Sequence, residues 1–309
     1  MNSKRIIVRI KQLWLFAFLI RLFKRLTIPG FDGMSVHEVS SFFIKGIWQG
    51  AITTRAAALS FTFFLALFPA IIFFFTLIPY IPIHGFQDTL MIMLHNILPT
   101  ETYHSALSTL DDIIRRQHGS LLSFGFIVAL YVSTSGITGI MNAFNNSIHV
   151  KETRSYFKQK LIAILLVFIL SIIIIAAISL LTLGNSFLRY LVAQGFFQNH
   201  FKYYALIVVK WIVIVALFFF TISFLYYLAP ARHGRFRFIS PGSTLATFLF
   251  IMTSIGFNYY ISHFSQYNKL YGSIGALIII LMWIYINAIV ILIGFELNAS
   301  IRNASGKKK

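Results

Sequence analysis

The stretch LIAILLVFILSIIIIAAISLLTL at residues 161–183 decides the fold of this chain. It is almost entirely Ile, Leu, Val and Ala, and it has no ionisable side chain. A helix needs about 20 predominantly apolar residues to cross the hydrocarbon core of a bilayer, so this stretch is long enough to span it. Five other stretches also qualify: 56–83, 121–144, 205–228, 240–262 and 273–299. The sequence therefore predicts an all-α, polytopic membrane protein with six transmembrane helices.

The composition of the whole chain supports this class. Of its 309 residues, 58% are hydrophobic and only 11% are charged, whereas a soluble protein has about 45–50% apolar and about 25% charged residues. A soluble fold of this length has no interior that hides so many apolar side chains. A cytosolic globular enzyme, a disordered chain and a coiled coil are therefore excluded. The absence of cysteine also excludes a disulfide framework, a thiolate metal site and a cysteine nucleophile.

The basic residues predict the orientation of the spans. The net charge is +18, and twenty of the 26 Lys and Arg residues lie in the terminal segments and the loops on one side, against five in the opposite loops. Positively charged loops stay in the cytoplasm, so both termini are expected there. In a soluble protein this charge would suggest nucleic acid. In a membrane protein we expect contact with anionic lipid headgroups at the cytoplasmic face and no nucleic-acid partner.

Residues 1–50 are expected to form cytoplasmic, basic amphipathic helices. The apolar run at 13–20 is too short for a signal peptide, and no cleavage site follows it. We therefore interpret residues 4–26 as a helix that lies on the inner leaflet. Ser35 and Glu38 form a capping-box pattern, which starts a second surface helix ahead of the first span.

The rest of the chain divides into a six-span membrane domain at 51–300 and a basic C-terminal tail at 301–309. The loop between the first two spans is long, and apolar residues recur in it at helical spacing. We expect residues 86–116 to form an extracytoplasmic helical hairpin. Two placements are open for this hairpin: over the outer mouth of the bundle, or on the lipid headgroups.

The second span carries small and polar residues that the third span lacks. Ser135, Gly139 and Ala143 recur at four-residue steps, a pattern that lets helix backbones approach closely. Asn142 and Asn145 lie near the expected cytoplasmic end of the same span. Two interpretations are open: the pattern serves tight helix packing, or Ser135, Gly139, Asn142 and Asn145 line a polar path.

Charged residues and a proline mark the other spans. Pro69 interrupts the first span and predicts a kink, either for packing or for lining a transport site. Arg55 starts that span, and Glu296 is the only acidic residue associated with any span. A charge near the hydrocarbon pairs or faces water, so we predict an Arg55–Glu296 ion pair, which serves as a structural clasp, a headgroup contact or a coupling site. Lys210 is expected to extend to the outer interface.

Motifs for catalysis or metal binding are missing from the sequence. None of the nine histidines falls in an HxH or HxxxH arrangement, and no carboxylate cluster joins them. There is no G-x-S-x-G motif and no Walker loop. We therefore expect no catalytic residue, no metal and no cofactor, and we expect that the protein is not an enzyme.

Several motifs carry a family resemblance. They are TRAAALSF at 54–61 with LFP at 67–69, VKETRS at 150–155, and YGSIGA at 271–276 followed by GFELNA at 294–299. Together they resemble the YihY / virulence factor BrkB family of bacterial membrane proteins. The positions that match the family motifs are Arg55, Pro69, Glu152, Arg154, Glu296 and Asn298.

The resemblance implies a location in the bacterial cytoplasmic (inner) membrane and a link to envelope integrity, with lipid export or transport proposed for some relatives. Family members have carried the name ribonuclease BN, which is regarded as a misassignment. We favour a transporter or exporter of lipid or lipid-linked substrate, because an amphiphile needs no charge at the membrane midplane. The alternatives are a non-transporting scaffold for envelope protein partners and an ion or small-solute transporter, for which a midplane acid would be expected.

Overall fold

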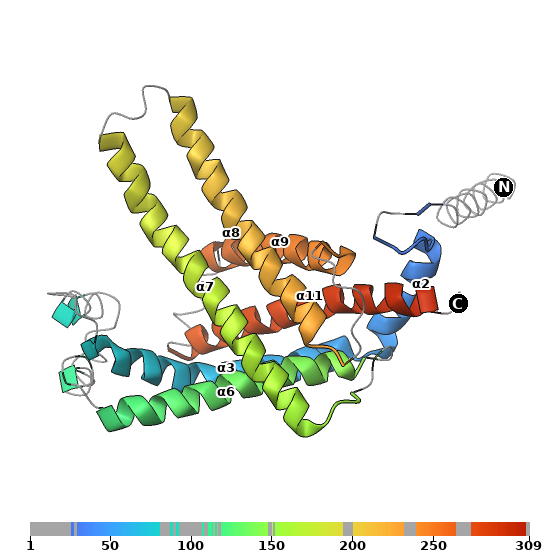
Figure 1. The fold of residues 1–309 in the computed structure, drawn as a ribbon, viewed down its shortest axis with the longest axis horizontal. Coiled ribbons are helices and arrows are strands. Elements are labelled where there is room, and N and C mark those ends of the chain that lie inside the picture. The colour runs from blue at the N-terminus through green and yellow to red at the C-terminus, as the bar shows by residue number, and fades with distance from the viewer. Residues whose placement is uncertain are drawn as a thin grey trace, which may run out of the picture. The chain divides into compact units, whose positions relative to one another are not determined.

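The computed structural model describes residues 26–27, 30–80, 87–88, 91–92, 107, 111–112, 114, 116, 119–147, 150, 152–193, 200–231, 239–263 and 273–306. This part of the chain is helical and contains no strand. Its helices are α2 (Val36–Gln49), α3 (Ile52–Leu77), the 3₁₀ turn η1 (Ile78–Tyr80), α6 (Gly119–Asn145), α7 (Tyr156–Ala193), α8 (His200–Leu228), α9 (Pro241–His263) and α11 (Ser273–Gly306) (Figure 1). The predicted all-α class is confirmed.

Six helices in the described part of the chain are long and apolar enough to cross a membrane. Their spanning stretches are Ile52–Ala70, Leu122–Asn145, Tyr156–Ala177, Leu206–Leu228, Pro241–Ile261 and Leu277–Ser305. Each overlaps one of the six stretches expected from the sequence, so the prediction of a polytopic membrane protein is confirmed. The predicted helix at 4–26 falls almost entirely outside the described residues. Only isolated residues of the predicted hairpin at 86–116 are described.

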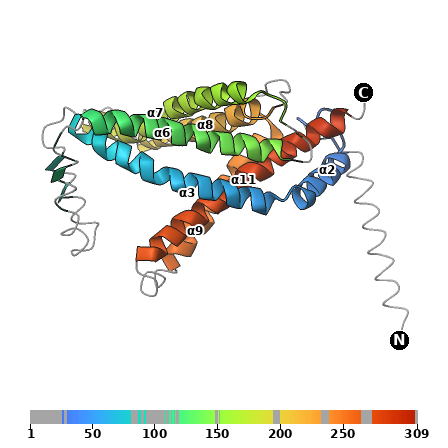
Figure 2. The same cartoon turned by 90° about the horizontal axis from the view of Figure 1, so that it is seen from below.

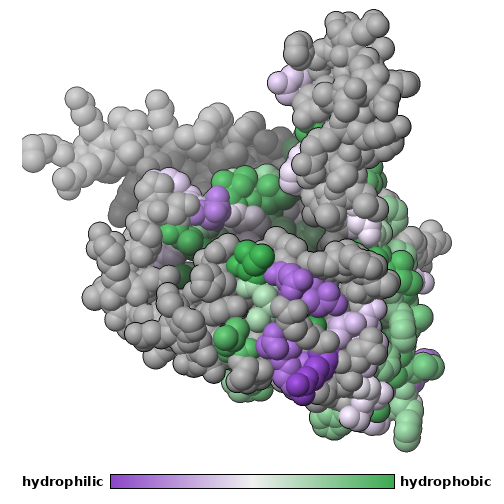
Figure 3. All heavy atoms as spheres, turned by 90° about the vertical axis from the view of Figure 1, so that its left-hand side faces the viewer, coloured by the Kyte–Doolittle hydropathy of each residue, from purple (hydrophilic) through white to green (hydrophobic). Residues whose placement is uncertain are grey.

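Large apolar side chains point outward from the spanning helices. Ile172 of α7 is 66% exposed and Trp211 of α8 is 54% exposed. Hydrophobic side chains cover much of the coloured surface in the space-filling view (Figure 3). Exposing such an apolar surface to water is unfavourable, whereas lipid tails are as apolar as these side chains.

The chain forms two compact units, Met1–Ser60 with Ile137–Lys309, and Phe61–Gly136. In the first unit, α11 packs against α9 and α2, and α8 packs against both α7 and α9. The helices α7 and α8 form a long antiparallel hairpin, and α2 lies beside the C-terminal part of α11 in both ribbon views (Figures 1 and 2).

The crossing of α9 and α11 depends on two glycines. A Cβ placed on Gly294 would lie 2.6 Å from the carbonyl oxygen of Gly242 and 2.7 Å from the Cβ of Ala246. These distances are shorter than side-chain contacts allow. The two helices therefore approach closely because small residues face each other, as is common between membrane helices.

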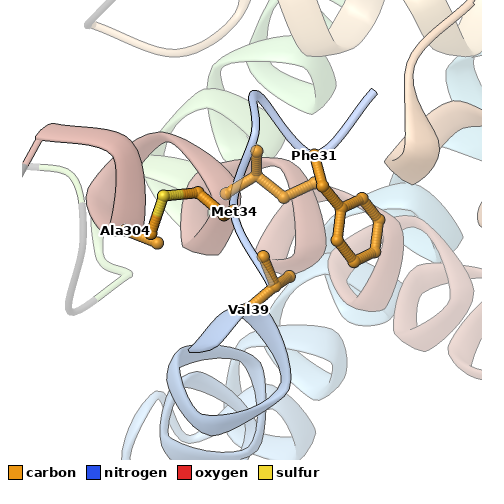
Figure 4. Packing of buried hydrophobic residues seen from close by; sticks show 5 residues of the cluster. Phe31, Met34, Val39 and Ala304 are labelled. Atoms are coloured by element: carbon orange, nitrogen blue, oxygen red, sulfur yellow. The ribbon is translucent and has the colours of Figure 1, made fainter. Parts of the chain in front are cut away.

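The start of α2 is anchored on the end of α11. The Ser35 hydroxyl accepts a hydrogen bond from the Glu38 amide at 3.3 Å, and the Ser35 amide donates to the Glu38 carboxylate at 3.1 Å, so the predicted capping box is present. Phe31 and Met34 of the preceding turn are buried with Val39 of α2 and with Ala304 of α11 (Figure 4). This apolar cluster holds the turn against α11.

The second unit contains the later part of α3 and the earlier part of α6. Pro69 lies inside α3, which is helical from Ile52 to Leu77. A Cβ placed on Gly136 would lie 3.3 Å from the ring of Phe63, so α6 approaches α3 closely at this glycine. Such an approach is typical of small residues in spanning helices.

Candidate functional site

Helix ends meet on one side of the first unit, which we call the Arg55 end. Arg55, near the start of α3, donates to the Ala143 carbonyl near the end of α6 at 2.8 Å. Arg154, just before α7, donates to the Ala229 carbonyl just after α8 at 2.7 Å. The Gly242 amide, in the first turn of α9, donates to the Asn298 side chain of α11 at 2.8 Å. Starts of helices thus lie against ends of helices.

A buried ion pair lies at the centre of this end. The Arg55 Nη2 atom lies 3.3 Å from Oε2 of Glu296, and their side chains are only 8% and 0% exposed. The other carboxylate oxygen of Glu296 accepts a hydrogen bond from the Ser147 hydroxyl at 2.9 Å. Burying charges is costly unless each is paired and hydrogen-bonded, and both oxygens of this carboxylate have a partner.

The helix α2 covers this ion pair through a glycine. A Cβ placed on Gly46 would lie 2.8 Å from Cγ of Glu296, so only glycine allows α2 to pack directly on the carboxylate. The sequence analysis did not identify Gly46 or Ser147 as site residues. A glycine inside a helix destabilises it by about 1 kcal/mol relative to alanine. A glycine at position 46 of a predicted helix could therefore have indicated a close packing contact.

A second polar cluster joins the end of α6, the loop before α7 and the end of α8. Arg154 donates two hydrogen bonds of 2.9 Å to the Glu152 carboxylate, from Nε to Oε1 and from Nη2 to Oε2. Asn145 donates to the same carboxylate and accepts from the Ala231 amide at 2.9 Å. The hydrogen bonds from Arg154 hold the pKa of Glu152 below its ordinary value, although partial burial acts in the opposite direction.

Asn298 forms a third polar contact, between α11 and the start of α9. Its side-chain oxygen accepts from the Gly242 amide at 2.8 Å, and its nitrogen donates to the Ser240 hydroxyl at 2.9 Å. The Ser240 hydroxyl also accepts from the Ser243 amide at 3.1 Å. Ser240 is thus the N-cap of α9, and Asn298 fixes this cap to α11.

A cavity of about 270 Å³ opens beside this contact. It is bounded by α8, the start of α9, the C-terminal part of α11 and the turn that precedes α2. Its lining residues are Gly30, Asp32, Ser223, Tyr226, Tyr227, Ser240, Pro241, Asn298, Ile301, Arg302 and Ser305. Most of these residues are polar, and they include one carboxylate and one guanidinium, while about half of the exposed lining is apolar.

The four residues of the predicted polar path lie elsewhere. The Ser135 hydroxyl donates to the Tyr131 carbonyl of its own helix at 2.9 Å, and Asn142 accepts a hydrogen bond from Gln159 of α7 at 2.8 Å. Asn145 bonds to Glu152 in the second polar cluster. Gly139 lies on α6 between Ser135 and Asn142. None of these four residues lines the cavity described above.

The remaining marked positions, Pro69 and Lys210, do not line the cavity. Pro69 is in the second unit, inside α3. The Lys210 ammonium lies 5.7 Å from the ring centre of Trp211 on α8, a distance that allows a cation–π contact. Among the described residues, no group of three or more His, Cys, Asp or Glu side chains is placed to hold a metal ion.

These features define a polytopic helical membrane protein whose buried charges gather at one end of its helices. The family model described as Virulence factor BrkB matches residues 43–309, and the chain belongs to this family. Its resemblance to the YihY / BrkB family is thereby confirmed.

Individual relatives agree with this assignment. The chain is 31% identical over 250 residues to the ribonuclease-like protein YfkH of Bacillus subtilis, which covers 80% of this chain and 88% of the relative. It is 24% identical over 274 residues to a UPF0761 membrane protein of Tolumonas auensis, covering 85% of this chain and 84% of the relative. A UPF0761 membrane protein of Pseudoalteromonas translucida is 43% identical over 77 residues, or 25% of this chain and 26% of the relative. No solved structure gives a significant match.

Proposed function

We propose that this chain transports or exports a lipid or lipid-linked substrate in the bacterial cytoplasmic membrane, and thereby supports the integrity of the envelope. The observation that carries the proposal is the cavity at the Arg55 end, which is lined by polar and charged residues and lies among helices whose outer faces are apolar. The positive-inside rule assigns the Arg55 end to the cytoplasm. The cavity would then lie at the depth of the inner-leaflet headgroups, where a lipid can enter it from the side.

The distribution of charge supports a lipid over an ion as the substrate. The described candidate spans contain Asp, Glu, Lys or Arg only toward their ends: Arg55, Lys158, Lys160, Lys210, Glu296 and Arg302. Ion-coupled transporters use ionisable residues inside the membrane as binding sites and proton relays. A lipid needs a polar route only for its headgroup, because its acyl chains remain in the bilayer.

The ribonuclease-like name belongs to the Bacillus relative, and we do not extend it to this chain. The nine histidines of the sequence form no HxH or HxxxH pattern. The buried carboxylate of Glu296 bonds to Arg55 and Ser147. It therefore acts as a link between helices in this proposal, without a catalytic role.

A reconstitution experiment tests the transport of lipid. The full chain would be placed in vesicles of phosphatidylethanolamine and phosphatidylglycerol that contain a trace of fluorescent lipid, with and without a proton gradient. We expect the fluorescent lipid to cross between the leaflets faster than in protein-free vesicles, as followed by quenching with an impermeant reductant. Equal rates with and without folded protein, under both conditions, would contradict the proposal and favour the scaffold alternative.

A further inference from the structure

The turn before α2 forms one wall of the cavity. Gly30 and Gly33 have positive φ angles of 94° and 76°, and Asp32 between them has a φ of 55°. A Cβ on Gly30 would lie 2.9 Å from Cγ of Pro241, so the turn is pressed against the first residue of α9. Aspartate is one of the few residues other than glycine that tolerate this backbone region. The carboxylate of Asp32 is thereby placed at the cavity wall.

The opposite wall is part of the same anchored region. Phe31 and Met34 of the turn pack with Ile301 and Ala304 of α11 (Figure 4). Arg302 follows Ile301 directly and lines the cavity. The apolar cluster thus fixes the turn beside the stretch of α11 that carries the guanidinium. Asp32 and Arg302 therefore border one cavity although they are distant in the sequence.

Several neutral polar groups of the lining are already engaged. The Tyr226 hydroxyl donates to the Ile291 carbonyl at 2.6 Å, and the Asn298 side chain is bonded to the start of α9. The Ser305 hydroxyl donates to the Arg302 carbonyl at 2.9 Å. The Gly242 and Ser243 amides of the α9 N-terminus also have acceptors. The formal charges of the lining are those of Asp32 and Arg302, so the electrostatic recognition of a charged ligand would depend on these two side chains.

The two charges have the chemistry of a receptor for a zwitterion. A guanidinium has five N–H donors in a planar fork that matches phosphate. A carboxylate accepts hydrogen bonds from an ammonium group. The volume of about 270 Å³ is just below the range of about 300–1,000 Å³ that is usual for ligand sites. A small headgroup fits this volume better than a large one.

We infer that the cavity binds a phosphoethanolamine headgroup, with its phosphate on Arg302 and its ammonium group on Asp32. The source of this headgroup is a membrane phospholipid, because the helices that bound the cavity present apolar side chains to the bilayer. Ile239, next to the cavity residue Ser240, is 71% exposed, and we expect it to contact the acyl chains. The inference deepens the proposed function by naming the substrate class, but binding is measured separately from transport.

The test is native mass spectrometry of the full chain, purified in detergent and mixed with equal amounts of phosphatidylethanolamine, phosphatidylcholine and phosphatidylglycerol. The wild-type protein should retain phosphatidylethanolamine best. Phosphatidylcholine has the same phosphate and charge but no N–H to donate, so it should be retained less well. This comparison needs no variant. Equal retention of the three lipids would overturn the inference.

Variants separate the two charges. Arg302→Gln should weaken retention of both phosphatidylethanolamine and phosphatidylglycerol by at least about tenfold, because a charge-assisted contact to phosphate is lost. Arg302→Lys should retain part of the binding. Asp32→Asn should remove about three- to fivefold of the preference for phosphatidylethanolamine while leaving phosphatidylglycerol unchanged. Asparagine also tolerates the positive φ at this position, so the turn should persist.

Matched controls lie in the other unit. Arg116→Gln and Asp111→Asn remove exposed charges far from the cavity residues in sequence, and they should leave lipid retention unchanged. Loss of retention in these controls equal to that of the cavity variants would show a non-specific effect of charge and overturn the site.

A competition arm distinguishes the source of the headgroup. Free O-phosphoethanolamine should displace phosphatidylethanolamine only at a large excess, because it has no acyl chains. If it binds as tightly as the lipid, the cavity serves a soluble phosphate ester and the lipid assignment is wrong. If the lipid binds as inferred but does not cross vesicles, the transport proposal fails and the binding site stands. If lipid crosses and Arg302→Gln still binds it fully, the site fails and the transport proposal stands.

Discussion

Arg55 and Glu296 are separated by 241 residues and form an ion pair of 3.3 Å that links the first spanning helix to the last. The pair also reaches α6, because Arg55 donates to the Ala143 carbonyl at 2.8 Å. Three spanning helices therefore meet at one buried pair of charges. Disrupting it should loosen the whole Arg55 end.

Removing one partner of this pair should be more damaging than removing both. Arg55→Met or Glu296→Gln alone should destabilise the protein by about 3–5 kcal/mol, because each leaves a buried charge without its counter-ion. The double variant should cost less than either single variant, because it leaves no buried charge without a counter-ion. Unfolding in mixed detergent micelles measures these differences. The exposed Arg116–Asp112 pair, with its arginine 78% exposed, is the control and should contribute about 0–1 kcal/mol. Independent, additive effects of Arg55 and Glu296 would refute the coupling.

Gly46→Ala should destabilise the protein although alanine is the better helix former. The new Cβ would lie 2.8 Å from Cγ of Glu296, and overpacking of this kind costs about 1–3 kcal/mol. Gly256→Ala is a matched control inside α9, because a Cβ there meets nothing within 4 Å. It should be neutral or stabilising by up to about 1 kcal/mol. Thermal unfolding in detergent compares the two. An equal response of both variants would contradict the close contact of α2 with Glu296.

The Glu152–Arg154 contact should make stability depend on pH in the acid range. The pKa of Glu152 is lowered in the folded protein, chiefly by hydrogen bonds from Arg154. The unfolded state therefore binds a proton more readily than the folded state. The stabilisation is present above the unfolded-state pKa and is lost as the pH falls through the lowered folded-state pKa. Glu152→Gln should flatten this part of the curve of melting temperature against pH. A variant with the same acid dependence as the wild type would show that Glu152 does not contribute.

The distribution of basic residues predicts the orientation of the chain in the membrane. Reporter fusions at His118 and Gln198 should be active on the outside, and fusions at Lys151 and His233 on the inside. A fusion after Lys309 should also be cytoplasmic. A periplasmic signal from the Lys309 fusion would reverse the assignment of the Arg55 end.

Ser135→Ala should leave both stability and function unchanged. The Ser135 hydroxyl donates to the Tyr131 carbonyl within the same helix, so its removal breaks no contact between helices. Even interhelical hydrogen bonds in membranes average only about 0.6 kcal/mol. Cell-envelope resistance to detergent and the melting temperature are the two measurements. A correctly inserted Ser135→Ala protein that loses envelope function would restore the polar-path interpretation of α6.

Local sequence was sufficient for the helices and for several of their ends. In lipid, a single run such as 161–183 can bond all of its own backbone N–H and C=O groups only by forming a helix. The capping box at Ser35 and Glu38 also depends only on neighbouring residues. The family motifs likewise marked Arg55, Glu152, Arg154, Glu296 and Asn298 without any knowledge of their distances.

The partners of these residues depend on how distant segments pack, which local sequence does not encode. Glu296 lies against Gly46 and Ser147 only because α2 and the end of α6 converge on α11. The Asp32–Arg302 cavity likewise exists because an apolar cluster of Phe31, Met34 and Ala304 holds the turn against α11. Hydrophobicity alone thus determined that the chain enters a membrane as helices. Close packing of small and charged side chains between helices, a property of the tertiary structure, decided where the polar groups meet.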